Sequence, residues 1–230
     1  MNRKSATRKG FVAAAALSAV IGLSACGTND VDTAQAADST SSSVSVPKPT
    51  AVVRAIPGGD TAVTLDSGFV SALGTLGLTP GVTGTATLDG TTGVVDFPIT
   101  GGTVTLYDRE SGYRPWVQGV VFHDGSGLTL AAGGTTVELS NFVIDPGKPA
   151  RLFGDVTVNG QLAAGNAPLF DLDGSTLSAP TMGADGSAVL DGTTVKLSDE
   201  AAGLLNSTFK TDALAGGLVI GTSTITVETE

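Results

Sequence analysis

The 230-residue sequence has few of the residue types on which enzyme active sites most often depend. It contains one cysteine and one histidine, and only 5% of its residues are aromatic. A lone cysteine excludes an intrachain disulfide. One cysteine and one histidine are also too few for the usual zinc-binding spacings. A Ser-His-Asp triad would have to use His123, and the nearby Gly125-Ser126-Gly127 lacks the spacing of a nucleophile elbow. The sequence therefore predicts a non-enzymatic protein without a metal site.

Basic residues are also scarce, because twelve Lys and Arg stand against 22 Asp and Glu. Four of the twelve lie within the first nine positions, so residues 26–230 carry eight basic against 22 acidic residues, a formal charge of −14. Nucleic acids and anionic lipid surfaces are bound through clustered Lys and Arg. This charge argues against both as partners of the protein surface and is typical of a well-solvated extracytoplasmic domain.

The N-terminal apolar run is too short to span a membrane. It extends over the 13 residues from Phe11 to Leu23, whereas a spanning helix needs roughly 20. A basic head before such a run is typical of a secretory signal peptide, although an uncleaved anchor is an alternative. Leu23, Ser24, Ala25 and Cys26 resemble a lipobox, the cleavage and acylation site of bacterial lipoproteins. We therefore expect a lipoprotein signal peptide over residues 1–25 and a palmitate-bearing Cys26. The alternative is an ordinary signal peptide, which would leave Cys26 as a free thiol.

Acylation of Cys26 would hold the protein at the cell membrane, on the extracytoplasmic face and thus at the cell surface. Residues 26–50 then form an acylated cysteine and a flexible linker, since they are rich in Ser, Thr, Asp and Ala and end near Pro47-Lys48-Pro49. Residues 51–230 are numerous enough to bury one hydrophobic core. We expect them to form a single domain.

The composition of that domain favours strands. Apolar and polar residues alternate over 62–65, 102–107, 135–139, 155–158 and 222–227. Alternation of this kind is typical of antiparallel strands with one buried face, and the 32 glycines suit many tight turns. The fold class predicted is all-β, an antiparallel β-sandwich.

Three further segments refine this fold. Apolar residues at helical spacing predict one or two short helices, over 66–76 and 198–209. Residues 117–122 and 128–130 are expected to pair around a turn at 124–127. The string Leu-Asp-Gly-Thr-Thr occurs at 88–92 and again at 190–194, which either a duplication or a shared turn-and-strand vocabulary would explain.

The tyrosines, the tryptophan and the histidine gather in one place. Both tyrosines, the only tryptophan and the only histidine fall within 17 residues, at Tyr107, Tyr113, Trp116 and His123, with two arginines between them. Aromatic residues and arginine are enriched at binding hot spots. These four are therefore the candidate ligand-binding residues, the alternative being a core tryptophan with tyrosines on a hairpin rim. Tyr and His can also ligate haem iron.

Paired carboxylates offer a further candidate chemistry. Asp171 and Asp173 share one face of a predicted strand, as a glycoside hydrolase would require of its two acids. Surface acids on an acidic protein explain them as well, and the scarcity of aromatic platforms argues against a sugar site. Residues 171–174 also resemble part of a calcium loop, but its third acidic ligand and closing glutamate are missing. A turn is the favoured interpretation.

Within residues 62–227, the segments Asp96–Gly102, Gly119–His123, Leu128–Leu130, Val137–Ile144, Leu152–Val156 and Leu169–Leu172 and the predicted helix over 198–209 follow one another in a characteristic order. This order resembles that of the HtaA-type haem-binding domain of actinobacterial surface proteins. The resemblance implies a β-sandwich with short helices and haem capture at the cell surface through Tyr and His. The family's early tyrosine is absent, since Phe69 and Val70 stand there, and so is its tyrosine near the final helix.

Together these features predict a lipid-anchored, extracytoplasmic, non-enzymatic binding protein with an HtaA-like domain and no cofactor of its own. A haem-uptake lipoprotein that uses His123 with Tyr107 or Tyr113 is the first alternative. A carbohydrate-active surface enzyme is the second. The expected partners are the membrane, through Cys26, and haem or a protein or glycan ligand, but not nucleic acid.

Overall fold

The computed structural model describes residues 45–229, and the expected signal peptide, lipobox and acylated Cys26 lie outside the described residues. The strands are β1 (Ala51–Val53), β2 (Gly59–Leu65), β3 (Thr79–Gly84), β4 (Thr87–Asp89), β5 (Val94–Pro98), β6 (Gly101–Leu106), β7 (Val117–Ala132), β8 (Thr135–Asp145), β9 (Arg151–Val158), β10 (Gln161–Asp173), β11 (Thr181–Met182), β12 (Ala188–Leu197) and β13 (Val219–Val227). The α-helices are α1 (Ser67–Thr75) and α2 (Asp199–Phe209), and the 3-10 helices are η1 (Arg109–Ser111) and η2 (Gly174–Thr176).

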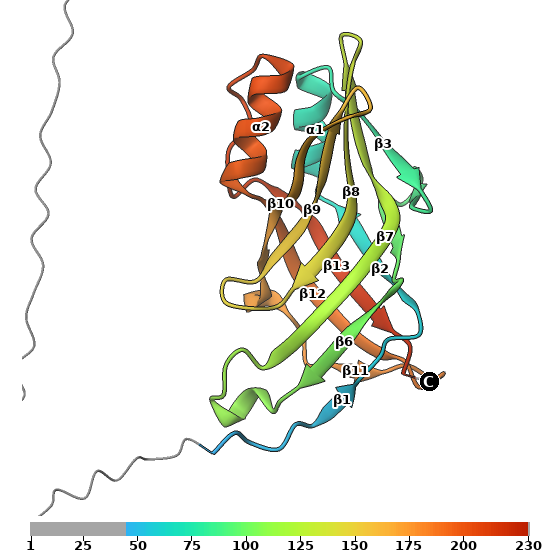
Figure 1. The fold of residues 1–230 in the computed structure, drawn as a ribbon, viewed down its shortest axis with the longest axis vertical. Helices are drawn as coiled ribbons and strands as arrows, with labels where there is room; N and C mark the ends of the chain where they lie inside the picture. The colour runs from blue at the N-terminus through green and yellow to red at the C-terminus, as the bar shows by residue number, and fades with distance from the viewer. Residues whose placement is uncertain (1–44, 230) are drawn as a thin grey trace, which may run out of the picture. The chain divides into compact units, whose positions relative to one another are not determined.

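All of these strands join one antiparallel sheet. Its order is β1-β6-β7-β8-β9-β10-β12-β13-β2-β5-β4, while β3 pairs with β7 and β11 pairs with β12. The sheet curls, so that β7 to β10 lie in front of β12, β13 and β2 in Figure 1. The predicted all-β antiparallel sandwich is confirmed, and its two layers are the two halves of this curled sheet.

Both predicted helices are present, and each begins at a side-chain cap directly after a strand. The Asp66 carboxylate accepts hydrogen bonds from the backbone N–H groups of Gly68 and Phe69 at the start of α1, at 2.8 and 3.1 Å. Ser198 Oγ accepts from the Ala201 N–H at the start of α2, at 2.9 Å. Such caps satisfy the first free N–H groups of a helix. Within residues 45–229, neither helix is long and apolar enough to cross a membrane.

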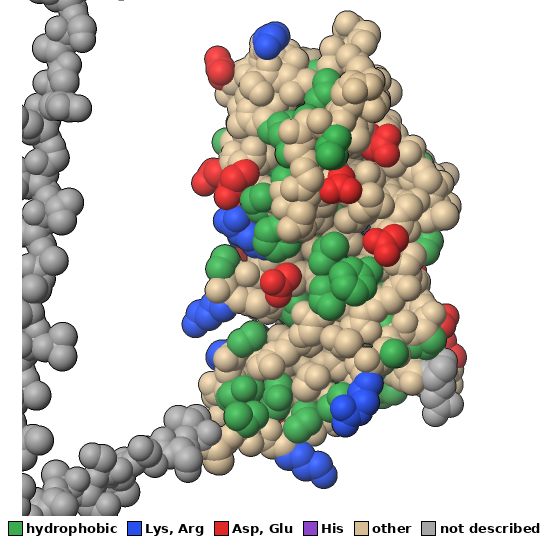
Figure 2. Space-filling model, viewed as in Figure 1, with side chains coloured by type: hydrophobic (Ala, Val, Ile, Leu, Met, Phe, Trp, Pro, Cys, Tyr) green, Lys and Arg blue, Asp and Glu red, His purple; other side chains and the backbone are tan. Residues whose placement is uncertain are grey.

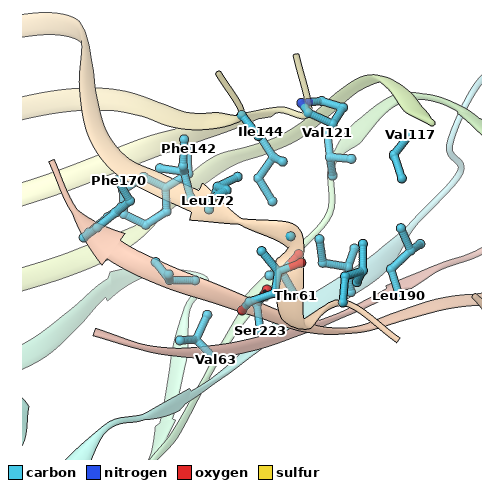
Figure 3. A pocket seen from close by; sticks show the side chains of 18 of the residues that line it. Thr61, Val63, Val117, Val121, Phe142, Ile144, Phe170, Leu172, Leu190 and Ser223 are labelled. Carbon is cyan, nitrogen blue, oxygen red and sulfur yellow. Dashed lines mark hydrogen bonds between the residues drawn. The ribbon is translucent and has the colours of Figure 1, made fainter. Parts of the chain in front are cut away.

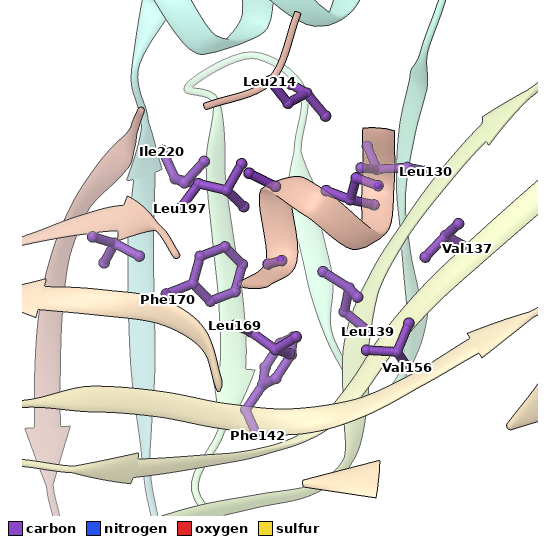
Figure 4. Packing of buried hydrophobic residues seen from close by; sticks show 14 of the residues in the cluster. Leu130, Val137, Leu139, Phe142, Val156, Leu169, Phe170, Leu197, Leu214 and Ile220 are labelled. Carbon is purple, nitrogen blue, oxygen red and sulfur yellow. The ribbon is translucent and has the colours of Figure 1, made fainter. Parts of the chain in front are cut away.

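The buried residues form two hydrophobic clusters. The first lies beneath the helices, and Figure 4 labels Leu130, Val137, Leu139, Phe142, Val156, Leu169, Phe170, Leu197, Leu214 and Ile220 among its members. The second lies at the end of the sheet away from the helices and comprises Ile56, Ile99, Val104, Leu106, Val121, Ile144, Leu177, Ala188, Leu190 and Val227. The candidate site lies between the two clusters, in the middle of the curled sheet.

One sequence prediction was wrong, because the two segments expected to pair across residues 124–127 belong to a single strand, β7. On β8, Phe142 pairs with His123 and Ser140 pairs with Gly127. A step of four residues on β7 therefore faces a step of two on β8. Residues 124–127 thus form a bulge, a feature that bends a strand and re-aims its side chains.

Hydrogen bonds from both strands hold this bulge. The Gly125 N–H donates to Asn141 Oδ1 at 3.0 Å, and Ser126 Oγ donates to the His123 carbonyl at 3.1 Å. Asn141 has a φ of 54°, in the left-handed region that asparagine tolerates, and its Nδ2 donates to Asp155 Oδ2 at 3.0 Å. The bulge is therefore fixed by its own side chains and by the neighbouring strands β8 and β9.

The error has a physical reason. Asp124-Gly125-Ser126-Gly127 has the composition of a turn. The alternation of buried residues also changes phase there, from Val121 and His123 to Leu130. A bulge and a turn both produce these two signals, and only the partner strand distinguishes them.

Candidate functional site

A cavity of about 320 Å³ lies between the two halves of the curled sheet (Figure 3). Its wall draws on both hydrophobic clusters and is almost entirely apolar. Members of the wall labelled in Figure 3 are Thr61, Val63, Val117, Val121, Phe142, Ile144, Phe170, Leu172, Leu190 and Ser223. Pockets for small molecules have volumes of about 300–1,000 Å³ and mostly apolar walls with a few polar groups. The size and lining of this cavity match that description.

Strand alternation explains how the sequence builds this wall. On β2, Thr61, Val63 and Leu65 line the cavity, and on β13, Ser223 and Ile225 do so. Successive side chains of a strand point to opposite faces, so residues two apart share the inner face. The predicted alternation over 62–65 and 222–227 is thus the pattern that lines one side of the cavity.

Three buried polar side chains interrupt the apolar wall. Thr61, His123 and Ser223 are each less than 5% exposed. His123 Nε2 lies 2.9 Å from Thr61 Oγ1, whereas its Nδ1 has no hydrogen-bond partner among the described residues. Thr61 and Ser223 come from adjacent strands, because Val63, two residues from Thr61, pairs with Ser223. These three side chains form a polar region of the cavity wall, and none of them is an acid or a Lys or Arg.

The buried imidazole of His123 is neutral at physiological pH. Burial lowers the pKa of His123 to about 4, because the apolar surroundings disfavour the charged ring. The Phe142 backbone carbonyl and the Asp124 carboxylate oppose this shift in the pKa, although the carbonyl makes no hydrogen bond to Nδ1 by distance and angle. The inner wall therefore presents no positive charge.

A row of aromatic rings supports His123. Phe97 lies edge-to-face against His123 at 6.5 Å between ring centroids and against Phe142 at 5.3 Å. Phe142 in turn meets Phe170 at 6.4 Å. Edge-to-face contacts of this kind are favourable and fix ring orientation. Sequence reasoning missed these phenylalanines as site residues, because they are far apart in sequence and meet only when the sheet curls.

The structure brings together two of the four predicted ligand-binding residues. Trp116 and His123 both line the cavity. Tyr107 and Tyr113 instead contact each other, with ring centroids 4.6 Å apart, and neither lines the cavity. The guanidinium of Arg109 lies 5.6 Å from the centre of the Trp116 ring.

The positions of His123 and the two tyrosines determine whether they can ligate one haem iron together. A His–Tyr pair would have to face one iron atom, but neither tyrosine reaches the cavity that His123 lines. His123 Nε2 is also engaged by Thr61. The described residues therefore do not fit a haem held by His123 together with Tyr107 or Tyr113 in this cavity.

Part of the cavity lining comes from Arg114 to Val117 and from Pro146, Gly147, Lys148 and Ala150. We call this part of the lining the mouth, because its Arg114 and Lys148 are exposed to solvent. Figure 2 shows a cleft at the left edge of the face in view, with Lys or Arg side chains beside it. The mouth is therefore polar and positively charged, whereas the interior is apolar.

The paired carboxylates predicted for glycoside chemistry are held in ion pairs. Arg151 Nε lies 3.0 Å from Asp171 Oδ1, without hydrogen-bond geometry, and Lys196 Nζ lies 2.7 Å from Asp173 Oδ2. The hydrogen bond from Lys196 holds the pKa of Asp173 well below its usual range. Leu172 lines the cavity, so the acids on either side of it face outward.

Other acidic groups do not assemble a site either. Asp173 also accepts a hydrogen bond from the Ser175 N–H at 2.9 Å at the start of η2. The turn predicted over residues 171–174 therefore begins only after Asp173, because residues 171–173 belong to β10. In the stretch from residue 45 to residue 229, no three His, Cys, Asp or Glu side chains lie close enough to hold a metal ion. The cavity is thus the feature of the described chain best suited to bind a ligand.

Comparison with known proteins gave similarity to solved structures alone. No family model and no curated protein matches the chain. The C-terminal domain of HtaA from Corynebacterium glutamicum superposes with a TM-score of 0.50 at 15% identity, covering 76% of this chain and 99% of that one. The heme binding protein HtaB from the same organism gives a TM-score of 0.43 at 12% identity, covering 78% and 96% of the two chains. The superposition on the HtaA domain shows that the described residues have the HtaA-like fold that the order of sequence segments predicted.

Proposed function

We propose that this chain is a non-enzymatic binding protein that takes an apolar ligand into the cavity of the curled sheet. The observation that carries the proposal is the cavity itself, about 320 Å³ in volume, apolar inside and open at one mouth. Among the described residues that line it, there is no Asp or Glu to complete a catalytic group with His123 and a hydroxyl side chain. Apolar surface removed from water would supply the binding free energy, at about 25 cal/mol per Å².

The sequence supports an extracytoplasmic address for this binding protein. The lipobox-like residues before Cys26 and the polar linker after it favour a domain attached to the outer face of the cell membrane. A lipid-anchored binding domain at that place would capture ligands outside the cell. The lipid anchor is thus part of the proposal.

The first test uses Trp116, the only tryptophan in the chain and a residue of the cavity wall. Purified full-length protein is titrated with the neutral apolar dye N-phenyl-1-naphthylamine. We expect saturable dye binding and a matching change in Trp116 emission. In Val121→Phe, an added ring would fill the cavity, and we expect dye affinity to fall by about tenfold or more, the equivalent of about 1.4 kcal/mol.

A matched substitution serves as the control. Val52→Phe makes the same change at a β1 side chain that is 45% exposed and does not line the cavity, so it should leave dye binding unchanged. Equal dye affinity in Val121→Phe and the unmodified chain would overturn the proposed function. A haemin titration of the same proteins, with His123→Ala, extends the test. A specific Soret band lost in that variant would assign the site to haem.

The proposed attachment to the membrane through Cys26 is tested separately. Cys26→Ser removes the acylated thiol, so we expect the protein to leave the membrane fraction, because acyl chains contribute about 0.8 kcal/mol per buried CH₂. Fractionation with metabolic palmitate labelling measures this change. Unchanged membrane partitioning and continued label in Cys26→Ser would refute acylation at this residue. The cavity test does not depend on this outcome.

A further inference from the structure

The charge at the mouth differs from the charge of the chain. The chain as a whole carries a formal net charge of −10. At the mouth, however, the charged side chains that line the cavity are Arg114 and Lys148, and both are basic. They come from separate loops, one before β7 and one between β8 and β9. The antiparallel pairing of β7 with β8 places these two loops at the same end of the strand pair.

These two cations also lack carboxylate partners. Elsewhere on the described surface, Arg151 pairs with Asp171 and Glu200, and Lys196 pairs with Asp173. Neither Arg114 nor Lys148 forms an ion pair within residues 45–229. Arg114 Nη1 donates to the Tyr113 carbonyl at 2.8 Å, which leaves its other donors available. Asp145, near Lys148 in sequence, is engaged through Oδ1 by the Gly147 N–H at 2.8 Å.

An anionic group would therefore be stabilised at the mouth and excluded from the interior. Burying an unpaired charge in an apolar wall is costly. The buried polar groups, Thr61, His123 and Ser223, provide no compensating positive charge, because the His123 ring is neutral. A ligand with one charged end would thus place this end beside Arg114 and Lys148 and its apolar part inside.

We propose that the ligand is an unbranched fatty acid, with its carboxylate between Arg114 and Lys148 and its single alkyl chain in the cavity. This inference rests on the proposed function, since it names the chemistry of the ligand of the same cavity. A volume of about 320 Å³ lies near the lower end of ligand pockets, which suits one slender chain. Apolar contacts hold the chain, and the two cations orient it.

The test compares two ligands that differ only in the head group. Dodecanoate and dodecan-1-ol are titrated into the full-length protein at low ionic strength, followed by Trp116 emission. Charge-assisted hydrogen bonds to exposed side chains should make dodecanoate bind about tenfold more tightly than the alcohol. The double variant Arg114→Gln/Lys148→Gln should lose that preference and keep its affinity for the alcohol. Lys48→Gln, an exposed cation that does not line the cavity, is the charge control and should retain the preference.

Chain length gives an independent readout. Each methylene added to the fatty acid should raise the affinity about fourfold, until the cavity is full. If carboxylate and alcohol bind equally and Val121→Phe weakens both, the cavity binds apolar ligands and the fatty-acid inference is overturned. If Val121→Phe weakens the binding of neither ligand, both the proposed function and the fatty-acid inference are overturned. If the preference for dodecanoate survives Arg114→Gln/Lys148→Gln, the assigned position of the carboxylate is wrong.

Discussion

Lowering the pH from 7 to 4 is expected to reduce the free energy of unfolding by about 3 kcal/mol through His123 alone. The pKa of His123 is about 4 in the folded chain and about 6.5 when unfolded, because the buried ring cannot be hydrated. Between these values the unfolded chain binds one more proton than the folded chain. Stability from this residue is therefore fully present above pH 6.5 and is lost as the pH falls towards 4.

Urea unfolding at several pH values measures this loss, with His123→Gln as the reference. Glutamine keeps a donor for Thr61 and does not titrate, so the many carboxylates affect both proteins alike. The difference in unfolding free energy between the two proteins should shrink by about 3 kcal/mol from pH 7 to pH 4. Parallel pH profiles of the two proteins would show that His123 is not buried as the structure places it.

Replacing Gly127 by alanine is expected to destabilise the fold by about 3 kcal/mol or more, an effect as large as that of a core truncation. A Cβ at this position would lie 2.2 Å from the Leu139 carbonyl oxygen and 2.8 Å from the Ser140 Cα, both backbone atoms of β8. Neither can yield without separating β7 from β8 at the bulge. Since the bulge directly follows His123, which lines the cavity, dye binding in the cavity should weaken as well.

Gly74→Ala is the matched control for that substitution. Gly74 lies in α1, where an added Cβ meets no atom within 4 Å. Alanine is the better helix former by about 0.8–1.0 kcal/mol, so this variant should be slightly more stable than the unmodified chain. Thermal or urea unfolding compares the two. A Gly127→Ala protein as stable as Gly74→Ala would contradict the close packing of β7 on β8.

Local patterns in the sequence were enough to predict the strand-rich fold and both helices. The alternation over 62–65 and 222–227 corresponds to the inner face of β2 and β13, and Asp66 and Ser198 cap the two helices as helix-start residues do. These features depend on residues close together in the chain. The bulge at 124–127 was missed because its identity depends on the register with β8.

The candidate site was only half predictable for the same reason. Clustering along the sequence identified Trp116 and His123, which do line the cavity, but it also selected the tyrosines, which do not. Arg114 and Lys148 are more than 30 residues apart, and the pairing of β7 with β8 places their loops at the same end of the strand pair. Alternating apolar strands do not reveal a hollow between them, because a filled core and a lined cavity share one pattern.

The most direct test of the binding cavity is contact quenching of Trp116 by a bromine-labelled ligand. The full-length protein is titrated with 2-bromododecanoate, whose bromine lies beside the carboxylate and therefore near Trp116, and bromine quenches tryptophan emission only at short range. If the ligand binds inside the curled sheet, we expect saturable quenching at one ligand per chain in the unmodified protein. We expect this quenching to be lost in Val121→Phe. Absence of saturable quenching, or equal quenching in Val121→Phe, would contradict the conclusion that this sheet encloses a ligand-binding cavity.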